Sequence, residues 1–556
     1  MPQTLRPPQG LFFVEPAAWE VKVGESSHLA HSQLEIYDTT LRDGAQQEGI
    51  SLTVSDKLLI ASLLDDLGVG YIEGGWPGAN PKDSEFFKRA RSELNLGTAT
   101  LTAFGSTRRP RRSVQGDAQL LNLLEAETEA VCIVGKAWDY HVREALLTDL
   151  DDGVAMVAES VAYLKERDRR VFFDAEHFFD GYLSNPDFAL AVLRAAFEEG
   201  AERLVLCDTN GGRLQSEIAH TIEQVRAALP EADLGVHFHN DAGCAVASSL
   251  MAVEMGVRQV QGCINGYGER TGNADLSTVL PALVLKMGIP VLEPDNLERL
   301  SPIAHHIAEI VNISLDPHRP FVGASAFTHK AGLHTSAMAR RPDAYEHQDP
   351  TRVGNRTRTV VSELSGRSTI LAKAGDLGLE LSGSQAAEVL NDIKHMENLG
   401  YHFEAADGSF ELMLRRAGGW SHHYFELESF RVSTEHRSDG LVMAEATVKI
   451  LVGGERVIST GEGNGPVNAL DHAMREALRP HFPRLNLLRL TNYNVRVLDS
   501  TASTAAMVRV FIEMSDGVAT WGSIGVHENV IEASWEALPD GIVLGLLRTE
   551  HRSDPQ

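Results

Sequence analysis

Residues 34–46 read Leu-Glu-Ile-Tyr-Asp-Thr-Thr-Leu-Arg-Asp-Gly-Ala-Gln, a short apolar run that leads into a charged turn. The run Leu34–Asp38 predicts a buried strand. An open, doubly wound nucleotide-binding sheet should carry a G-x-G-x-x-G turn after its first strand. The turn Arg42–Gln46 has a single glycine and offers an arginine and an aspartate instead. The sequence therefore favours a closed parallel sheet over an open one.

Short apolar runs and longer amphipathic segments alternate from Leu34 to about Gly288. In the segment Asp56–Leu67, for example, leucines recur every fourth residue, which is typical of a helix with one buried face. Strand–helix pairs repeated in this way predict a (β/α)8 TIM barrel. The predicted strands are Leu34–Asp38, Tyr71–Gly74, Leu101–Phe104, Ala130–Val134, Val171–Asp174, Leu204–Cys207, Leu234–Phe238 and Gln259–Cys263.

The regular alternation is lost after the barrel. Shorter helices such as Gln385–Leu399 predict a mainly helical linker region, and alternating apolar residues from residue 444 onward predict strands. A strand-strand-helix unit ending in Val467–Leu478 returns about sixty residues later, ending in Val530–Leu538. The prediction is an N-terminal extension (1–30), a catalytic barrel (31–292), helical linker subdomains (293–418) and a C-terminal α+β regulatory domain with an internal repeat (419–556).

Composition and charge narrow the class of protein. Hydrophobic residues make up 43% and charged residues 23%, as in ordinary globular proteins. A formal net charge of −27 disfavours nucleic acid as a partner. No apolar stretch is long enough to span a bilayer, and residues 1–30 lack a signal-peptide pattern, so no membrane partner is expected. The cysteines form no C-x-x-C pair, which predicts a reducing, cytoplasmic location.

A divalent metal site is predicted at the mouth of the barrel. His237 and His239 stand two apart at the end of the seventh predicted strand, so both side chains share one face. Asp43 follows the first strand, which a closed barrel brings close to the seventh, and Asn273 is expected at the same rim. One carboxylate and two imidazoles leave positions open for water or substrate. Two separately satisfied histidines are the alternative. Magnesium, manganese, zinc and cobalt all suit the set.

Three more side chains are candidates for chemistry at this rim. Arg42 suits bidentate binding of a carboxylate or polarisation of a carbonyl; a salt bridge with an acid such as Glu73 is the alternative. Glu176 ends the fifth strand and is either a base or a partner that orients Arg42. Thr209 either donates to a substrate carboxylate or caps a turn. A metal-dependent hydrolase is a minor alternative, because the first strand is followed by Arg-Asp rather than H-x-H.

Several motifs resemble the synthases that condense acetyl-CoA with 2-oxo acids, the isopropylmalate, homocitrate and citramalate synthase family. The resemblance extends from about Leu34 to Leu547, and within the family two runs are most similar to citramalate synthases. The family motifs are Asp38–Gly44, His237–Asp241, Asn265–Asn273 and, in the regulatory domain, Gly461–Val467; the two runs are Glu73–Asp83 and Asp174–Gly181.

The resemblance implies a reaction of acetyl-CoA with pyruvate and water that gives (R)-citramalate and CoA, on the route to isoleucine. It implies that a divalent metal chelates the 2-oxo acid, that Arg42 polarises the ketone and that Thr209 binds the carboxylate. The implied metal ligands are Asp43, His237, His239 and Asn273. Alternatives are 2-oxoisovalerate, as in isopropylmalate synthases of leucine biosynthesis, or 2-oxoglutarate. A carbon–carbon lyase and a non-catalytic amino-acid sensor are more distant alternatives.

The resemblance also concerns the linker and the assembly. It implies that Glu176 belongs to the catalytic machinery together with His334. Tyr345 matches a tyrosine of the family's linker, and in the family these linker residues reach the active site of a neighbouring subunit. A homodimer is therefore implied, with an amino-acid effector at the C-terminal domain. Isoleucine and leucine both remain candidates for the effector.

Overall fold

The computed structural model of the chain describes residues 34–293, 295–329, 341, 343, 345–359, 366–436, 438, 440, 442–498 and 506–550. Contacts divide the chain into two compact units: the first extends to Phe327 and includes His347–Thr357, and the second takes Thr328–Glu346 and the chain from Arg358 onward. The predicted extension (1–30) and His334 lie outside the described residues. Within the described part, no helix is long and apolar enough to cross a membrane.

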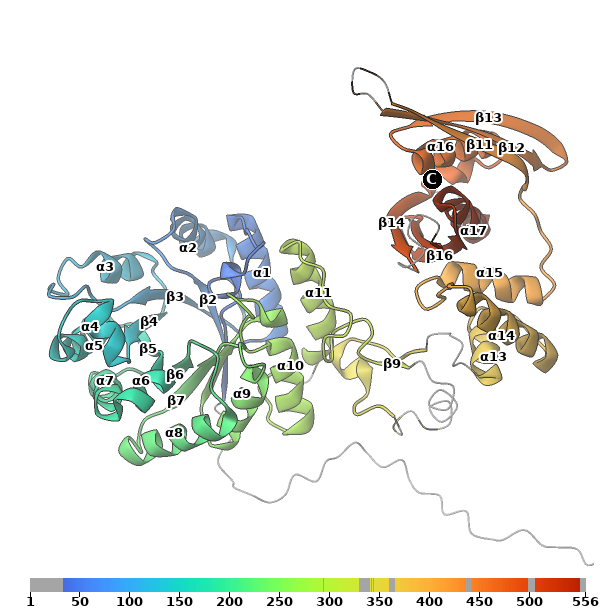
Figure 1. Cartoon of the computed structure of the whole chain (residues 1–556). Helices are drawn as coiled ribbons and strands as arrows, with labels where there is room; N and C mark the ends of the chain where they lie inside the picture. Colours follow the sequence, from blue (N-terminus) through green and yellow to red (C-terminus); the bar gives the residue numbers. More distant parts are fainter. Residues whose placement is uncertain are drawn as a thin grey trace, which may run out of the picture. The chain divides into compact units, whose positions relative to one another are not determined.

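The first unit is a closed barrel of eight parallel strands in sequence order, which confirms the predicted TIM barrel (Figure 1). Each strand pairs with the next, and β1 pairs with β8 to close the sheet. The strands are β1 (Glu35–Asp38), β2 (Tyr71–Gly75), β3 (Thr100–Ser106), β4 (Ala130–Lys136), β5 (Arg170–Glu176), β6 (Arg203–Asp208), β7 (Leu234–Phe238) and β8 (Gln259–Gly262).

Helices follow the strands and cover the outside of the barrel (Figure 1). Helix α1 begins two residues before its predicted start, because Thr53 and Asp56 form a capping box there. It ends at Gly68, whose φ of 92° suits a glycine C-cap. The helices of this unit are α1 (Val54–Leu67), α2 (Pro81–Glu93), α3 (Ala118–Glu125), α4 (Asp139–Glu144), α5 (Leu150–Lys165), α6 (Phe178–Ser184), α7 (Pro186–Glu198), α8 (Gln215–Ala228), α9 (Ala245–Glu254), α10 (Leu276–Pro281) and α11 (Leu300–Ile310).

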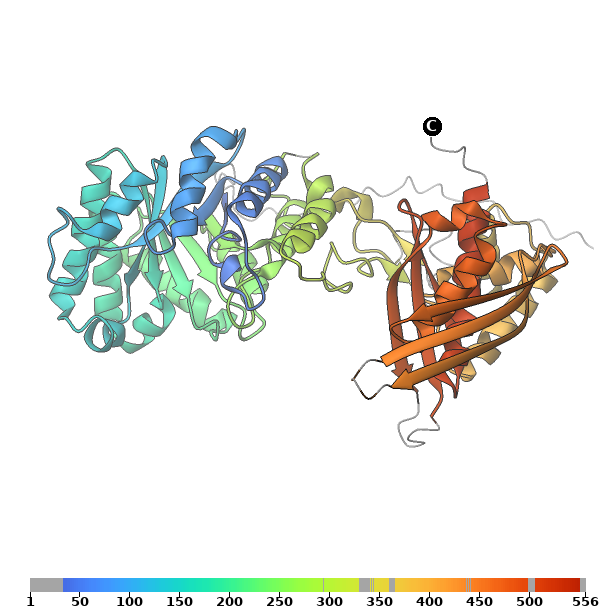
Figure 2. The same cartoon turned by 90° about the horizontal axis from the view of Figure 1, so that it is seen from above.

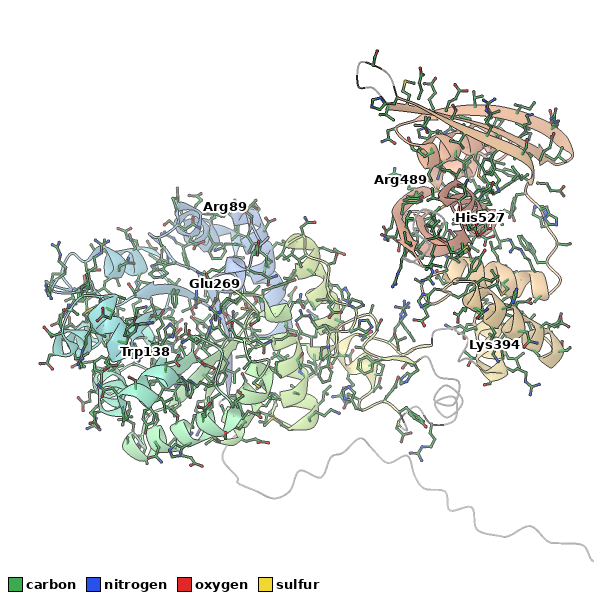
Figure 3. All side chains as sticks on the ribbon, viewed as in Figure 1. Arg89, Trp138, Glu269, Lys394, Arg489 and His527 are labelled. Carbon is green, nitrogen blue, oxygen red and sulfur yellow. The ribbon has the colours of Figure 1, made fainter. Side chains whose placement is uncertain are left out.

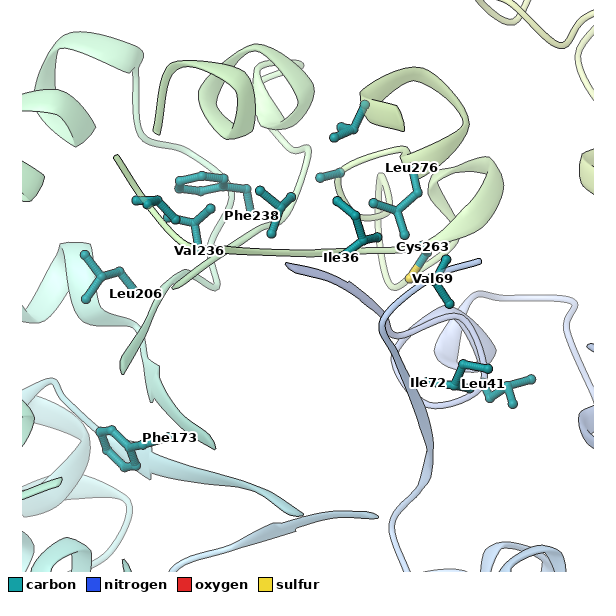
Figure 4. Close-up of a cluster of buried hydrophobic side chains, with 14 of the residues drawn as sticks. Ile36, Leu41, Val69, Ile72, Phe173, Leu206, Val236, Phe238, Cys263 and Leu276 are labelled. Atoms are coloured by element: carbon teal, nitrogen blue, oxygen red, sulfur yellow. The ribbon is translucent and has the colours of Figure 1, made fainter. Parts of the chain in front are cut away.

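Alternate residues of the strands build two different cores. Outward-facing side chains such as Ile36 and Val236 belong to the large cluster beneath the helices (Figure 4). Inward-facing aromatic rings fill the barrel: Tyr37 and Tyr71 stack at 5.9 Å, and Phe172 meets both edge-on at 5.8 and 5.0 Å. The direction of the side chains therefore alternates along each strand with a period of two residues, and both directions lead to a packed core.

The second unit contains a group of helices and two antiparallel sheets (Figures 1 and 2). Each sheet has three strands and is followed by a helix, and apolar residues of β12, β15 and both following helices form one core. The helices before the sheets share a smaller core with Ile524. The elements are β9 (Thr328–His329), β10 (Arg358–Thr359), α13 (Arg367–Asp376), α14 (Gly383–Asn398), α15 (Asp407–Ala417), β11 (Glu426–His436), β12 (Val442–Val452), β13 (Glu455–Gly463), α16 (Pro466–Leu478), β14 (Arg489–Val497), β15 (Val508–Ser515), β16 (Thr520–His527) and α17 (Val530–Glu550).

The internal repeat differs from its prediction in two respects. Each copy begins with a further strand, β11 or β14, so the unit is strand-strand-strand-helix. These strands are exposed along most of their length and therefore lack the apolar alternation that marks a strand in sequence. The second helix was predicted to end at Leu538, which is wrong: α17 continues past Pro539 to Glu550, with Ile542 and Leu546 buried in the core.

Helix α6 lies unusually close to the end of β4. The ideal Cβ of an alanine at Gly181 would lie 2.2 Å from the carbonyl oxygen of Ala137, nearer than a carbon atom can approach. Glycine at this position therefore allows α6, which follows Glu176 directly, to pack against the β4 end. The position of the Glu176 turn depends on this contact.

Gly181→Ala should lower the free energy of unfolding of the barrel by about 1–3 kcal/mol, because the backbone of α6 must shift to avoid the clash. Urea unfolding of the full chain measures this. Gly212→Ala is the matched control, since no atom lies within 4 Å of its added Cβ. Equal stability of the two variants would contradict the close packing.

Candidate metal centre and substrate pocket

Three buried side chains meet at the carboxyl ends of β1 and β7. Asp43 Oδ2 lies 3.2 Å from His237 Nε2 and 3.7 Å from His239 Nε2. The three residues are 3%, 5% and 7% exposed. Among the described residues, this is the one group of three whose ligand atoms all lie within 4.8 Å of one another. The predicted triad is therefore assembled in the fold, as a buried set of donors that suits a divalent metal.

Charges around the triad keep Asp43 ionised. Burial alone would raise the pKa of Asp43, but Arg42 and the hydrogen bond from His237 hold it well below its usual range. Burial and the neighbouring His237 lower the pKa of His239 to about 4. Asp43 is therefore an anionic carboxylate and His239 a neutral imidazole at neutral pH, as metal ligands must be. Against the lowering effect of burial, Asp43 raises the pKa of His237, so this ring gives up a proton when a metal binds.

A chain of hydrogen bonds fixes the ring of His237. Gln261 accepts from His237 Nδ1 at 3.0 Å and donates to Asp174 Oδ1 at 3.0 Å. Asp174 accepts in this chain, so the amide oxygen of Gln261 faces the histidine and a proton of the ring lies on Nδ1. The other ring nitrogen, Nε2, faces Asp43 Oδ2 at 3.2 Å and is the atom that would bind a metal once its proton has left. Such an outer partner is the usual support of a metal-binding histidine.

Asn273 lies next to His239, on the loop that follows β8. Its amide nitrogen donates to the carbonyl of Tyr267 at 3.0 Å, while its Oδ1 is buried without a hydrogen-bond partner. Gly268 allows this arrangement, because its φ is 150° and an added Cβ would lie 2.2 Å from the Asn273 amide nitrogen. Asn273 also forms a β-bridge with His239. An orphaned amide oxygen beside two imidazoles and a carboxylate fits a hard divalent cation.

Arg42 lies beside the triad and is held by Glu73. Its Nε donates to Glu73 Oε2 at 2.5 Å, its Nη1 lies 3.4 Å from Asp43 Oδ2, and its guanidinium stacks on Phe104 at 3.8 Å. Tyr37 donates to the other oxygen of Glu73 at 2.9 Å. Burial raises the pKa of Glu73, against the opposing effect of Arg42. Glu73 therefore orients Arg42. The salt bridge that the sequence offered as the alternative for Arg42 is present, and Glu176, the other partner considered, pairs with Lys136.

Glu176 and Thr209 lie at the ends of β5 and β6. Glu176 forms an ion pair with Lys136 of β4. Thr209 Oγ1 accepts a hydrogen bond from the backbone N–H of His177 at 2.9 Å. The hydroxyl proton of Thr209 stays available to a ligand, so the turn contact and the predicted substrate contact are compatible.

These residues line one cavity of about 480 Å³ in the barrel mouth. Its wall includes the metal triad, Arg42, Glu176 and Thr209, together with three more arginines, Arg108, Arg109 and Arg270. Glu269, labelled in Figure 3, lies on the same wall. Of the two predicted linker residues, Tyr345 is in the second unit and 42% exposed. Its role at the site, like that of His334, stays a prediction.

Known proteins match the chain along almost its whole length. Residues 33–307 match the HMGL-like family, residues 321–400 the homocitrate synthase post-HMGL domain-like family, and residues 404–545 the LeuA allosteric (dimerisation) domain. The chain is 52% identical over 516 residues to an (R)-citramalate synthase of Streptomyces coelicolor, covering 92% of this chain and 96% of that protein. It is 49% identical over 518 residues to one of Aquifex aeolicus, covering 93% and 98%.

The chain belongs to the (R)-citramalate synthase family. The resemblance predicted from the sequence is confirmed, including the citramalate branch. The predicted acyltransferase class is confirmed with it. The match of the C-terminal part to the LeuA allosteric (dimerisation) domain confirms a regulatory type of domain there.

Four residues of the candidate site were not predicted from the sequence. Glu73 was weighed only as an alternative partner of Arg42, and Lys136, Gln261 and Arg270 were given no role. Arg270 pairs with Asp241 at 2.8 Å, donates to the carbonyl of Thr209 at 2.8 Å and lies 3.2 Å from His239 Nδ1. Position gave a partial signal for two of them: Glu73 lies near the end of the second predicted strand, and Lys136 lies two residues beyond the end of the fourth.

Asp43→Asn should weaken Mn²⁺ binding by about 100-fold or more, because a neutral amide replaces the anionic ligand. Gln261→Met should weaken it by roughly 10–100-fold, since His237 loses the acceptor that fixes its ring. Isothermal titration calorimetry with Mn²⁺ measures both. Asp66→Asn, an exposed position on α1, is the control. Unchanged Mn²⁺ affinity in Asp43→Asn would exclude this centre.

Proposed function

We propose that the chain condenses acetyl-CoA with pyruvate and water, giving (R)-citramalate and free CoA. The observation that supports this most is the buried triad beside Arg42, in a chain about half identical to proteins named (R)-citramalate synthase. A divalent ion held by Asp43, His237, His239 and Asn273 would act as a Lewis acid toward the oxygens of a 2-oxo acid. Magnesium, manganese, zinc and cobalt are all candidates for this ion.

Arg42 is the fixed cation for the ketone. Glu73, Tyr37 and the Phe104 ring hold the guanidinium in place, and the pKa of Arg42 is raised by Glu73 and Asp43 despite the opposing effect of burial. A charge that needs no reorganisation stabilises the oxyanion that develops when the ketone carbon is attacked. Thr209 then offers its hydroxyl proton to the carboxylate of the 2-oxo acid.

Glu176 is the base of the proposed reaction. It lines the cavity and forms an ion pair with Lys136 of β4. Removal of a proton from the acetyl methyl group leaves an enolate, which forms the new carbon–carbon bond with the ketone carbon of pyruvate. Water then cleaves the thioester and releases the CoA thiol. His334 and Tyr345 are proposed to assist from the linker of a neighbouring subunit.

The LeuA allosteric (dimerisation) match supports a homodimer with an amino-acid effector at the C-terminal domain. Isoleucine and leucine are both candidates for this effector. The cytoplasmic location stays a prediction, supported by the four free cysteines.

The test of substrate is CoA-thiol release from acetyl-CoA with pyruvate and with 2-oxoisovalerate, in Mg²⁺ or Mn²⁺ and with a chelator as control. We expect pyruvate to give the higher kcat/KM and the chelator to abolish turnover. Preference for 2-oxoisovalerate would make the chain an isopropylmalate synthase with the same site. No turnover with any 2-oxo acid would favour the sensor alternative.

Glu176→Gln should lower kcat by about 10²–10⁴-fold, because the amide cannot accept the methyl proton. Mn²⁺ affinity should stay at the wild-type value, which separates loss of the base from loss of the site. Glu198→Gln, exposed on α7, is the matched control. Full turnover in Glu176→Gln would show that another group is the base.

A further inference from the structure

A run of arginines borders the mouth of the barrel cavity. Residues 107–112 read Thr-Arg-Arg-Pro-Arg-Arg and follow β3, in a chain whose formal net charge is −27. We call this segment the arginine loop. Arg108, Arg109 and Pro110 line the same cavity as the metal triad. The loop is therefore a cationic edge of the proposed active site on a strongly acidic protein.

The backbone of the arginine loop is fixed from several sides. The N–H of Arg108 donates to Ser160 at 2.8 Å, that of Arg109 to Asp117 at 3.0 Å, and that of Arg111 to Asp152 at 3.1 Å. These contacts tie the loop to α3 and α5. A loop held in this way presents its side chains without a large loss of conformational freedom on binding.

The carboxylates near the arginine loop already accept hydrogen bonds from other groups of the chain. Asp152 accepts from Arg108, from Thr148 and from the Arg111 backbone, and Glu159 pairs with Arg108 at 2.5 Å. Asp117 accepts from backbone N–H groups at the start of α3. Arg108 is thus a buried, neutralised anchor at 4% exposure. The nearby acids serve to hold the loop.

Two guanidinium groups are left for a ligand. Arg109 and Arg112 are exposed, and no ion pair is recorded for either of them within the described part of the chain. Arg111 donates its side-chain N–H to the carbonyl of Leu147 at 3.0 Å, which leaves its charge uncompensated. Several unpaired arginines on one fixed loop are suited to phosphate, which guanidinium groups bind through paired hydrogen bonds.

We propose that the arginine loop binds the phosphate groups of the 3′-phospho-ADP end of acetyl-CoA, while the thioester reaches Glu176 in the cavity. This rests on the proposed function, because acetyl-CoA is the substrate that carries phosphates. The local cations offset the repulsion by the acidic chain of a nucleotide end that carries about four negative charges. Binding energy from this remote end would hold the small acetyl group in place.

The test compares CoA with pantetheine, which lacks the nucleotide and its phosphates. Isothermal titration calorimetry of the full chain should show wild type binding CoA at least about tenfold more tightly than pantetheine. The double variant Arg109→Gln/Arg112→Gln should lose this difference and leave pantetheine affinity unchanged. Arg194→Gln, an exposed arginine of α7, is the control and should retain the full difference.

Kinetics provide the second readout. The double variant should raise KM for acetyl-CoA by about tenfold or more, with a much smaller effect on kcat and on the KM for acetyl-pantetheine. Wild-type KM for acetyl-CoA should rise with salt more steeply than that of the variant. An unchanged CoA affinity in the double variant would overturn the inference. Equal weakening of CoA and pantetheine would also overturn it, because the loop would then only shape the cavity.

The two proposals fail in different ways. If wild type distinguishes CoA from pantetheine through these arginines but no 2-oxo acid is turned over, the arginine loop is supported and the proposed function is wrong. If pyruvate is condensed but the double variant has wild-type KM and CoA affinity, the proposed function stands and the arginine loop has no role in binding.

Discussion

The candidate site depends on the closure of the barrel through the pairing of β1 with β8. Two hydrogen bonds connect the turn after β1 to the end of β8. The N–H of Thr39 donates to the carbonyl of Gly262 at 2.8 Å, and Thr40 Oγ1 accepts from the N–H of Ile264 at 2.9 Å. These contacts place Asp43 against the end of β7. Without the closed sheet, the carboxylate and the two imidazoles would lie on distant edges, and no metal centre would form.

The pairing of β1 with β8 also places several charged side chains in the interior of the barrel. Arg42, Asp43, Glu73 and Asp174 are all shielded from solvent, and removing any charge from water is costly unless it is paired and hydrogen-bonded. Arg42 is paired with Glu73 and Asp43, and Asp174 accepts from Gln261. A well-packed apolar set would serve stability at least as well. A function that needs a fixed cation beside an anionic ligand set accounts for these charges better than stability does.

Sequence reasoning located most of the barrel and the metal triad, because both depend on short-range spacing. The strand residues alternate between Ile36, which faces the helices, and Tyr37, which faces the interior, and the H-x-H spacing at the end of β7 places both imidazoles on one side. The ends of strands shifted by one or two residues. Thr209 lies at the rim and makes the turn contact, and its contact with a substrate stays a prediction.

Other features could not be predicted, because they depend on contacts between distant segments. Nothing near Glu73 or Gln261 in sequence indicates that the first holds Arg42 and the second holds His237, since these pairs form only when strands become neighbours. The strands β11 and β14 carry too few buried residues to show a period of two. Helix α17 continues through a proline because burial of its last turns outweighs the loss of one backbone donor.

The most direct test of the central claim is a crystal structure of the chain with Mn²⁺ and pyruvate, located by anomalous scattering from manganese. We expect one strong manganese peak between Asp43, His237 and His239, close to the amide oxygen of Asn273. Pyruvate should be bound to the ion, with its ketone oxygen facing Arg42. Manganese at another position, or pyruvate bound away from Arg42 in a crystal that turns over substrate, would contradict it.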